Sequence, residues 1–185
     1  MLMSIMEHFE NFPVLETRRL TLRKCLETDI PEFNRLASNP NVTTWIGWEP
    51  HKSVDETAAF VKLLTEGYER GTCMTWAMCD KETDKFMGLV SFVHVKEKNF
   101  SGEVGYWIGE EYWNKGYTTE AMKKIIGYAF ETLGLHRITA GHCVENLPSG
   151  RVMVKLGMKF EGVGHDEAYL HGKFYDIAHY ALINE

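Results

Sequence analysis

Several patterns that would point directly to a chemistry are missing from this chain of 185 residues. Its four cysteines are scattered without a C-x-x-C pair, so we expect reduced thiols in or near the core of a cytoplasmic protein. The eight histidines form no H-E-x-x-H motif or other tight cluster, and no G-x-x-x-x-G-K-[ST] phosphate loop occurs. The sequence therefore predicts neither a metal dependence nor a P-loop nucleotide site.

Long apolar runs and a basic charge balance are missing as well. No segment approaches the roughly 18 to 20 apolar residues that a membrane span needs, and the start, MLMSIMEHFENF, lacks the basic and apolar regions of a secretory signal. The net charge of −6 argues against a dedicated nucleic-acid surface. With 44% hydrophobic residues, we expect a single soluble domain spanning residues 1–185 with a sizeable core.

One stretch, residues 102–133, combines a strand signal with a helix signal. Residues 102–108 (GEVGYWI) are a compact run of aromatic and β-branched residues, which is typical of a strand. After Gly116 the apolar residues recur at helical spacing and form one stripe on a long helix, leaving Glu120, Lys123 and Lys124 for solvent. The stripe comprises Met122, Ile125, Ile126, Ala129, Phe130 and Leu133.

The junction between this strand and this helix is a candidate anion site. The first N–H groups of a helix have no partners within it and lie at the positive end of its dipole. Gly116 lets the backbone approach a ligand, and Lys115 adds positive charge. We therefore expect a phosphate or pyrophosphate on the backbone amides here, with an ordinary strand-to-helix turn as the alternative. The residues concerned are Asn114, Lys115, Gly116, Tyr117, Thr118 and Thr119.

The order of the remaining elements predicts an α+β, or mixed α/β, fold. Strands are expected at 14–25, 73–80, 86–95 and 136–144 and in a closing pair, and helices at 28–38, 53–70 and 146–156. Ser53 and Glu56 form a capping box for the helix at 53–70. The inner stripe of that helix is expected to hold Phe60, Leu63, Leu64 and Tyr68.

Two groups of side chains have alternative interpretations. Trp45 and Trp48 lie in an aromatic loop at residues 41–52, where they could wall an acceptor pocket, or cover the edge of the core or a dimer contact. His136 and His142 flank a strand six residues apart, and one of them could lie near a site. Structural or surface roles are the simpler interpretation of both histidines.

The segment WNKGYTTEA, with GEVGYWI before it and ENLPSGRVMVKLGM after it, resembles the GNAT superfamily of acyl-CoA N-acyltransferases. It is most similar to the branch that includes the RimJ/RimL ribosomal-protein N-terminal acetyltransferases. The pyrophosphate loop of the superfamily is Arg/Gln-x-x-Gly-x-Gly/Ala, and this chain has Trp113, Gly116 and Thr118 at the three defined places. The first and third depart from the broad pattern but follow the Trp-x-x-Gly-Tyr form that this branch often has.

The resemblance covers about residues 15–183 and implies the GNAT fold. That fold is a mixed, mostly antiparallel sheet of about seven strands with flanking helices, splayed at its centre to hold a pantetheine arm. Acetyl-CoA is the implied cosubstrate, with no metal. The backbone of Trp107 and Ile108 would pair with the pantetheine arm like an added strand, and the pyrophosphate would lie on the amides of residues 114–119.

The segment NLPSGR at residues 146–151 matches the Asn-x-x-Ser motif of the branch. By resemblance, Asn146 would bind the pantetheine or orient the thioester, and Ser149 would reach the coenzyme sulfur as a proton donor or hydrogen-bond partner. Both could instead simply cap the short helix that follows. Arg151 or Lys155 could contact the 3′-phosphate of the coenzyme, or remain a solvated helix charge.

The base that deprotonates the amine has three candidates. Glu103 lies in the strand where several GNAT enzymes place a carboxylate that acts through water, although it could be an ordinary outward residue. Glu167 lies near a glutamate used by some members of the branch, but Ala168 could hold that place. An ordered water is the third. If Glu103 is the base, Glu103→Gln should lower kcat at pH 7 by roughly 10²–10⁴.

These residues and the resemblance predict an N-acetyltransferase that moves an acetyl group from acetyl-CoA directly to a primary amine. No cysteine lies in a nucleophile motif, so a covalent enzyme intermediate is not expected. By resemblance the acceptor is a protein or peptide N-terminal amine. The alternatives are a small amine, such as a polyamine, amino acid or aminoglycoside, and a non-catalytic CoA-binding protein. No nucleic-acid or membrane partner is expected, while a homodimer is compatible with the family.

Overall fold

The computed structural model describes residues 7–185, so the first residues of the MLMSIMEHFENF segment lie outside the described part. Its helices are α1 (Glu7–Glu10), α2 (Ile30–Ala37), α3 (Pro40–Thr43), α4 (Val54–Glu69), α5 (Tyr117–Glu131) and α6 (Leu147–Lys155). Its strands are β1 (Leu15–Glu16), β2 (Leu20–Arg23), β3 (Thr75–Asp80), β4 (Phe86–Lys96), β5 (Ser101–Ile108), β6 (Arg137–Cys143), β7 (Lys159–Leu170) and β8 (Lys173–Ile183). No helix within residues 7–185 is long and apolar enough to cross a membrane.

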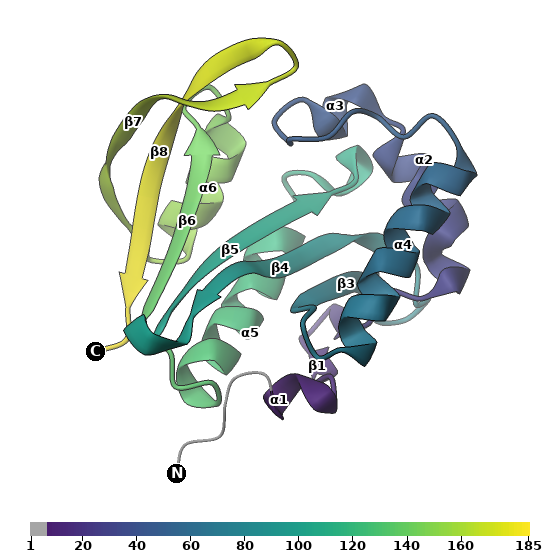
Figure 1. Cartoon of the computed structure of the whole chain (residues 1–185), viewed down its shortest axis with the longest axis horizontal. Coiled ribbons are helices and arrows are strands. Elements are labelled where there is room, and N and C mark those ends of the chain that lie inside the picture. Colours follow the sequence, from purple (N-terminus) through teal and green to yellow (C-terminus); the bar gives the residue numbers. More distant parts are fainter. Residues whose placement is uncertain (1–6) are drawn as a thin grey trace.

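One mixed sheet carries the whole fold, and its eight strands follow the order β1-β2-β3-β4-β5-β6-β8-β7 (Figure 1). Every neighbouring pair is antiparallel except β5 and β6, which are parallel. The expected mixed, mostly antiparallel sheet is therefore confirmed. The strand expected at 14–25 is two strands, because the Thr17 N–H donates to the Leu20 carbonyl at 2.9 Å and turns the chain between them.

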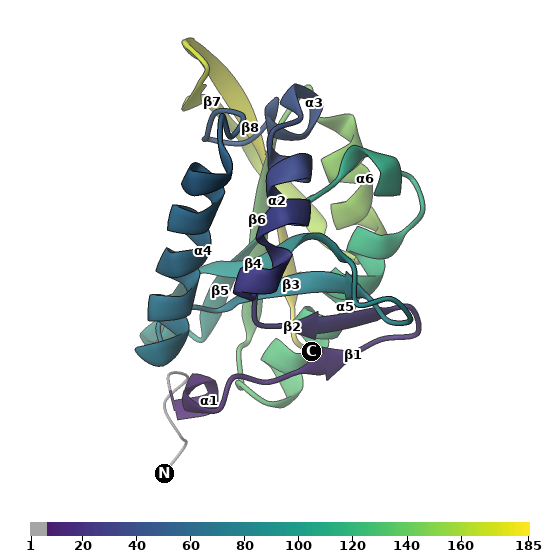
Figure 2. The ribbon, with the colours of Figure 1, turned by 90° about the vertical axis from the view of Figure 1, so that its right-hand side faces the viewer.

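Helices cover both faces of the sheet, with α2 and α4 on one face and α5 and α6 on the other (Figure 2). The strands alternate to match, since successive side chains of a strand point to opposite faces. In β3, Trp76 and Met78 join the core beneath α5, whereas Ala77 and Cys79 join the core beneath α2 and α4. These two cores hold the sheet and the helices in fixed relative positions.

The helix boundaries follow the sequence signals closely, with three corrections. The stripe on α5 is buried or partly buried as expected, but Glu120 is not left to solvent: it is covered by the turn between β1 and β2. On α4, Leu63 is 62% exposed and Val61 takes its place in the core. The loop expected from residue 41 contains α3, because Asn39 caps a new helical turn that begins with Pro40.

Candidate active site

The centre of the sheet opens between β5 and β6. The two strands pair only where Ser101–Glu103 meets Arg137–Thr139, and beyond that point they separate (Figure 1). Strand β6 continues alongside β8 as far as Cys143, and β5 continues alongside β4 as far as Ile108. The facing edges of the outer parts of β5 and β6 are therefore open to a ligand that lies between them.

The pairing of β5 with β4 fixes which backbone groups reach this opening. The Gly109 N–H donates to the Met87 carbonyl of β4 at 2.9 Å. Because N–H and C=O groups alternate between the two sides of a strand, Trp107 also points its backbone groups toward β4. Tyr106 and Ile108 point theirs into the opening, where the Ile108 carbonyl accepts the indole N–H of Trp113 at 2.9 Å.

The loop after β5 leaves the start of α5 without a side-chain cap. Asn114 and Gly116 both have positive φ, of 59° and 80°, so the chain reverses tightly just before the helix. The first intrahelical bond here joins the Glu120 N–H to the Gly116 carbonyl. The N–H groups of residues 117–119 thus have no intrahelical partner and lie at the positive end of the helix dipole.

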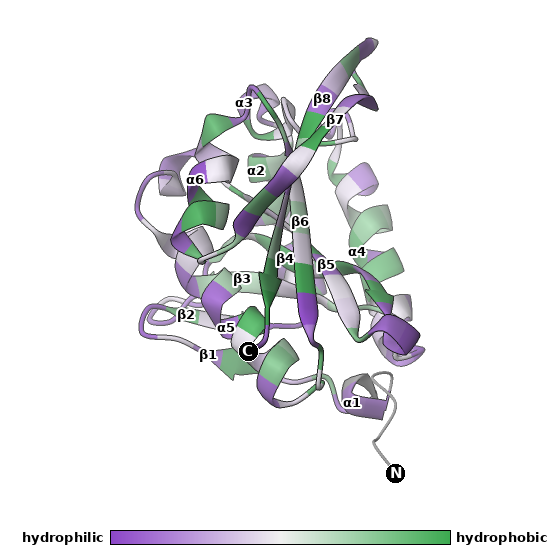
Figure 3. Cartoon of the chain, turned by 90° about the vertical axis from the view of Figure 1, so that its left-hand side faces the viewer, coloured by the Kyte–Doolittle hydropathy of each residue, from purple (hydrophilic) through white to green (hydrophobic). Residues whose placement is uncertain are grey.

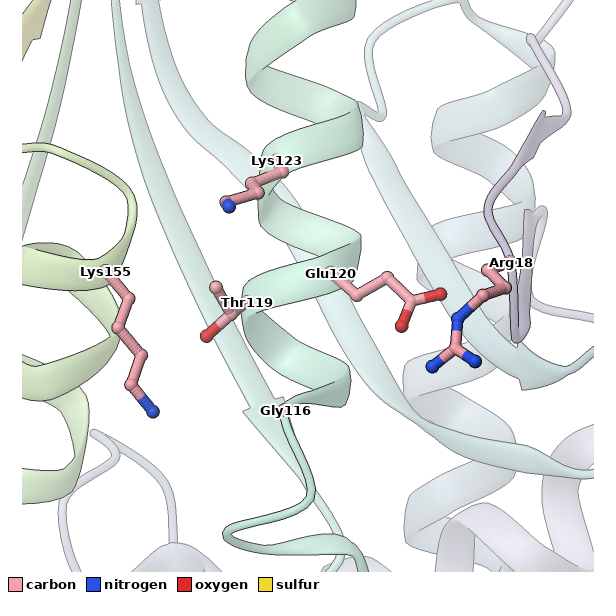
Figure 4. A pocket seen from close by; sticks show the side chains of 6 residues that line it. All are labelled: Arg18, Gly116, Thr119, Glu120, Lys123 and Lys155. Atoms are coloured by element: carbon pink, nitrogen blue, oxygen red, sulfur yellow. The ribbon is translucent and has the colours of Figure 1, made fainter.

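A shallow pocket of about 440 Å³ lies at this helix start. Three cations line it: Arg18 from the turn before β2, Lys123 from α5 and Lys155 from α6. Figure 4 shows the side chains of Thr119 and Lys123 on the side of α5 that faces Lys155, across the gap between the helices. Of the two residues considered for the 3′-phosphate, Lys155 lines this pocket, whereas Arg151 is exposed and does not.

Arg19, which no sequence motif marks, ties the loop to the first hairpin. Its Nε donates to Glu120 at 2.7 Å, its Nη1 donates to the Lys115 carbonyl at 3.0 Å, and its guanidinium lies 4.1 Å from the centre of the Tyr117 ring. Burial would raise the pKa of Glu120, but hydrogen bonds from Thr17 and Arg19 outweigh it and lower this pKa. The Arg19–Glu120 ion pair thus fixes the loop before α5 to the turn between β1 and β2.

At the start of α6, Asn146 and Ser149 occupy adjoining positions. The Asn146 Oδ1 accepts the Ser149 N–H at 3.4 Å, so Asn146 caps the helix in this structure. The Ser149 hydroxyl lies 2.8 Å from the Tyr106 hydroxyl of β5, so the two elements are joined across the opening. Burial raises the pKa of Tyr106 to about 12, and this phenol therefore stays protonated at neutral pH.

A second pocket, of about 540 Å³, is formed mainly by β6, β7 and β8 together with Glu103 of β5. It brings together both glutamates considered as bases, Glu103 and Glu167, and also Ala168. Within residues 7–185 no cation pairs with Glu103, whereas the Glu167 carboxylate is bound to His179 at 2.7 Å. No sequence motif marks His179 as a site residue.

The two loop tryptophans have different surroundings. Trp45 lines the second pocket and packs edge-on against Tyr175 of β8, with ring centres 5.7 Å apart. Trp48 packs against Trp107 at the edge of the core, with ring centres 5.9 Å apart. Trp45 therefore lines a pocket, and Trp48 covers the edge of the core.

His142 also lines the second pocket, while His136 is exposed. The His142 ring is buried, with Nδ1 2.7 Å from the Cys143 carbonyl and Nε2 packed against Gly150 of α6. Among the described residues, Nε2 has no hydrogen-bond partner. Because both Nε2 and the ring are enclosed by protein, His142 is part of the floor between the pocket and α6.

The four cysteines are free, as expected, and three of them are buried. Burial raises the pKa of Cys79 to about 12 and raises the pKa of Cys25 and Cys143 as well. A thiol acts as a nucleophile through its thiolate. These three side chains are therefore poor nucleophiles, even though Cys143 borders the second pocket. Among residues 7–185 no group of three or more His, Cys, Asp or Glu side chains could hold a metal ion.

A protein-family model described as an acetyltransferase (GNAT) domain matches residues 19–159. The chain belongs to the GNAT acetyltransferase family. One relative of this GNAT enzyme, the uncharacterized N-acetyltransferase YoaA of Bacillus subtilis (strain 168), is 31% identical over 172 residues, which are 93% of this chain and 97% of that protein. The crystal structure of a GNAT-family acetyltransferase from Bacillus anthracis has a TM-score of 0.82 at 27% identity, covering 92% of this chain and 98% of that one.

Two more distant relatives have named acceptors. The [ribosomal protein uS5]-alanine N-acetyltransferase of Escherichia coli (strain K12) is 27% identical over 137 residues, covering 70% of each chain. The spermidine N(1)-acetyltransferase of Vibrio cholerae serotype O1 is 26% identical over 160 residues, covering 86% of this chain and 90% of that protein. The family, the GNAT fold and the acyltransferase activity expected from the sequence are therefore confirmed.

Proposed function

We propose that this GNAT enzyme binds acetyl-CoA with the pyrophosphate at the start of α5 and the pantetheine arm along the open edge of β5. The free N–H groups of residues 117–119, the bent loop at Asn114–Lys115–Gly116 and the flanking cations supply what an anion needs. The pantetheine contacts expected for Trp107 and Ile108 become contacts of Tyr106 and Ile108 in this proposal, because the backbone of Trp107 points toward β4.

We assign the leaving-group side of the reaction to the start of α6. Asn146 orients the thioester end of the cosubstrate, and Ser149 donates a hydrogen bond or a proton to the sulfur as it leaves. The Tyr106 hydroxyl, 2.8 Å from the Ser149 hydroxyl, can replace a proton that Ser149 gives up. No side chain forms a bond to the acetyl group, so transfer to the amine is direct.

The acceptor enters from the second pocket, and the class that we propose is a protein or peptide N-terminal amine. The observation that carries this proposal is the carboxylate of Glu103, which lines the second pocket where β5 and β6 begin to separate and which no cation pairs with among residues 7–185. A carboxylate there attracts an ammonium group. The relative that acetylates an alanine of ribosomal protein uS5 supports a peptide acceptor.

A small cationic amine is the second candidate. The same pocket also contains Glu161 and Glu167, and the spermidine N(1)-acetyltransferase relative shows that a GNAT chain of similar length can take a polyamine. Amine binding at several carboxylates would favour a substrate with more than one positive charge. Membership of the RimJ/RimL branch, a cytoplasmic location and a homodimer stay predictions.

A turnover assay with a panel of acceptors separates these classes. The panel contains short peptides with free N-termini, the same peptides with blocked N-termini, polyamines, amino acids and an aminoglycoside, with release of CoA thiol as the readout. The proposal expects kcat/KM for free-N-terminus peptides at least tenfold above that for the small amines. The reverse ratio would move the assignment to a small amine, and no turnover with any acceptor would contradict both.

A further inference from the structure

Two histidine–carboxylate pairs have both partners on the β7–β8 hairpin, and one of the two faces the second pocket. In the first, the His165 Nδ1 lies 3.0 Å from Asp176, and neither residue lines the pocket. In the second, the His179 Nε2 lies 2.7 Å from the Glu167 Oε2, and both residues line it. Figure 3 shows how this hairpin projects from the rest of the chain beside β6. Of these two pairs, the His179–Glu167 pair is therefore the one that can meet a ligand of the pocket.

An irregularity in β7 is what aims Glu167 at His179. The register of β7 against β8 shifts between Gly164 and Ala168, so residues 165–167 bulge out of the ladder. Asp166 adopts a positive φ of 50°, and its N–H donates to Asp176 at 2.9 Å, which holds the bulge. The Glu167 carboxylate then folds back over Gly164, where a Cβ would lie only 1.6 Å from its Oε2.

The pair leaves one nitrogen of His179 available for chemistry. A carboxylate only accepts hydrogen bonds, so the proton of the neutral ring lies on Nε2. Nδ1 therefore carries the lone pair. His179 is paired with Gly141 of β6, and a Cβ on Gly141 would come within 3.8 Å of Nδ1. Gly141 and His179 both line the pocket, and the missing side chain at 141 leaves Nδ1 uncovered on that side.

We propose that His179 is the proton acceptor for the incoming amine, with Glu167 as the residue that positions its ring; this inference rests on the proposed function. The His179 Nδ1 takes one proton from the ammonium form of the acceptor. The neutral nitrogen then forms the C–N bond, the C–S bond breaks, and the second N–H proton passes through Ser149 to the departing thiolate. The proton on His179 leaves to solvent through the pocket.

The other ionisable groups around His179 fit this division of roles. They are Glu161 and Glu167 of β7, Arg137, His142 and Cys143 of β6, Tyr180 of β8, and Glu103 of β5 across the pocket; the guanidinium of Arg137 is paired with Glu161. Glu167 stabilises the imidazolium that forms, as a carboxylate does beside a catalytic histidine. Glu103 attracts the ammonium group, and the buried His142 has no access to it.

The test compares His179→Gln with His165→Gln, which removes the equivalent histidine from the pair outside the pocket. The kcat of both is measured from pH 6 to 9.5, with acceptors whose amines differ in pKa. We expect His179→Gln to lower kcat at pH 7 about 100-fold, within the range for general bases, and His165→Gln to change it less than twofold. The loss should shrink at least tenfold at high pH or with a weakly basic amine, because the amine then arrives neutral.

Binding of acetyl-CoA, by titration calorimetry, should be the same for both variants and the wild type. An equal kcat for the two variants, or a loss for His179→Gln that is constant with pH, would overturn the inference. If His179→Gln fails to fold, Glu167→Gln must show a smaller pH-dependent loss, about tenfold, and its absence would also overturn the inference. Lack of turnover by the wild type would instead count against the proposed function.

Discussion

The two pockets of this GNAT enzyme are built in opposite ways. The pocket at the start of α5 depends on backbone: a bent loop, free N–H groups and cations around them. The pocket beyond the opening of the sheet depends on side chains that come from β5, β6, β7 and β8. If acetyl-CoA and the acceptor bind as we propose, the first pocket holds its ligand mainly through one local backbone motif, while the second selects the acceptor through a few side chains.

After His179→Gln, the largest effect on the second pocket alone is expected from a change at Gly164. In Gly164→Ala the new Cβ would occupy the place of the Glu167 carboxylate, which must swing away from His179. We expect kcat to fall about tenfold, the value of one charge-assisted hydrogen bond, with acetyl-CoA affinity unchanged by titration. Gly127→Ala, where a Cβ meets nothing within 4 Å, is the control. A wild-type kcat in Gly164→Ala would show that the Glu167–His179 pair does not contribute to catalysis.

Glu103→Gln tests the role of the other carboxylate in the same pocket. If Glu103 attracts the ammonium while His179 takes its proton, KM for the amine should rise about fivefold to tenfold, which corresponds to about 1 kcal/mol of exposed charge interaction. The kcat of Glu103→Gln should stay within about threefold of the wild-type value. Steady-state kinetics with a saturating cosubstrate measure both. A kcat loss of 100-fold would instead make Glu103 the base, as the sequence alone suggests.

Arg19→Ala tests the backbone pocket without touching its N–H groups. Removal of the guanidinium frees the Lys115 carbonyl and Glu120, so we expect Kd for acetyl-CoA to rise about fivefold while KM for the amine is unchanged.

The same variant tests the pH dependence of stability. The pKa of Glu120 is lowered in the folded protein, so the stabilising effect of its charged form is present above the unfolded pKa of about 4.3 and is lost as pH falls. Melting temperatures at pH 7 and pH 3.5 should therefore differ less in Arg19→Ala than in the wild type.

The smallest effect is expected at Lys155. Lys155→Ala should raise Kd for acetyl-CoA about threefold at low salt, since exposed charge pairs contribute little. Affinity for the analogue without the 3′-phosphate should not change. Arg151→Ala is the matched control on the same helix, because Arg151 does not line the pocket. An effect of Arg151→Ala as large as that of Lys155→Ala would assign the phosphate contact to both residues.

The contrast between the pockets also explains what could be predicted from sequence. The loop and α5 lie within one contiguous stretch, so glycine, helical periodicity and family resemblance were enough to place them. Arg19 and Glu120 are 101 residues apart in the sequence, and the spacing of polar residues on α5 does not indicate their contact. The backbone of Trp107 points toward β4 and that of Tyr106 points into the opening, because the phase of the strand depends on its pairing with β4. The bulge that aims Glu167 at His179 likewise needs β8.

Titration calorimetry with acetyl-CoA on wild type, Gly116→Trp and Gly134→Trp tests the central claim most directly. Both glycines have positive φ and flank α5, but only Gly116 lies in the pocket, and Gly134 has open space around it. We predict micromolar binding by the wild type and Gly134→Trp, and none by folded Gly116→Trp. Equal binding by Gly116→Trp, or no binding by the folded wild type, would contradict the placement of acetyl-CoA at the start of α5.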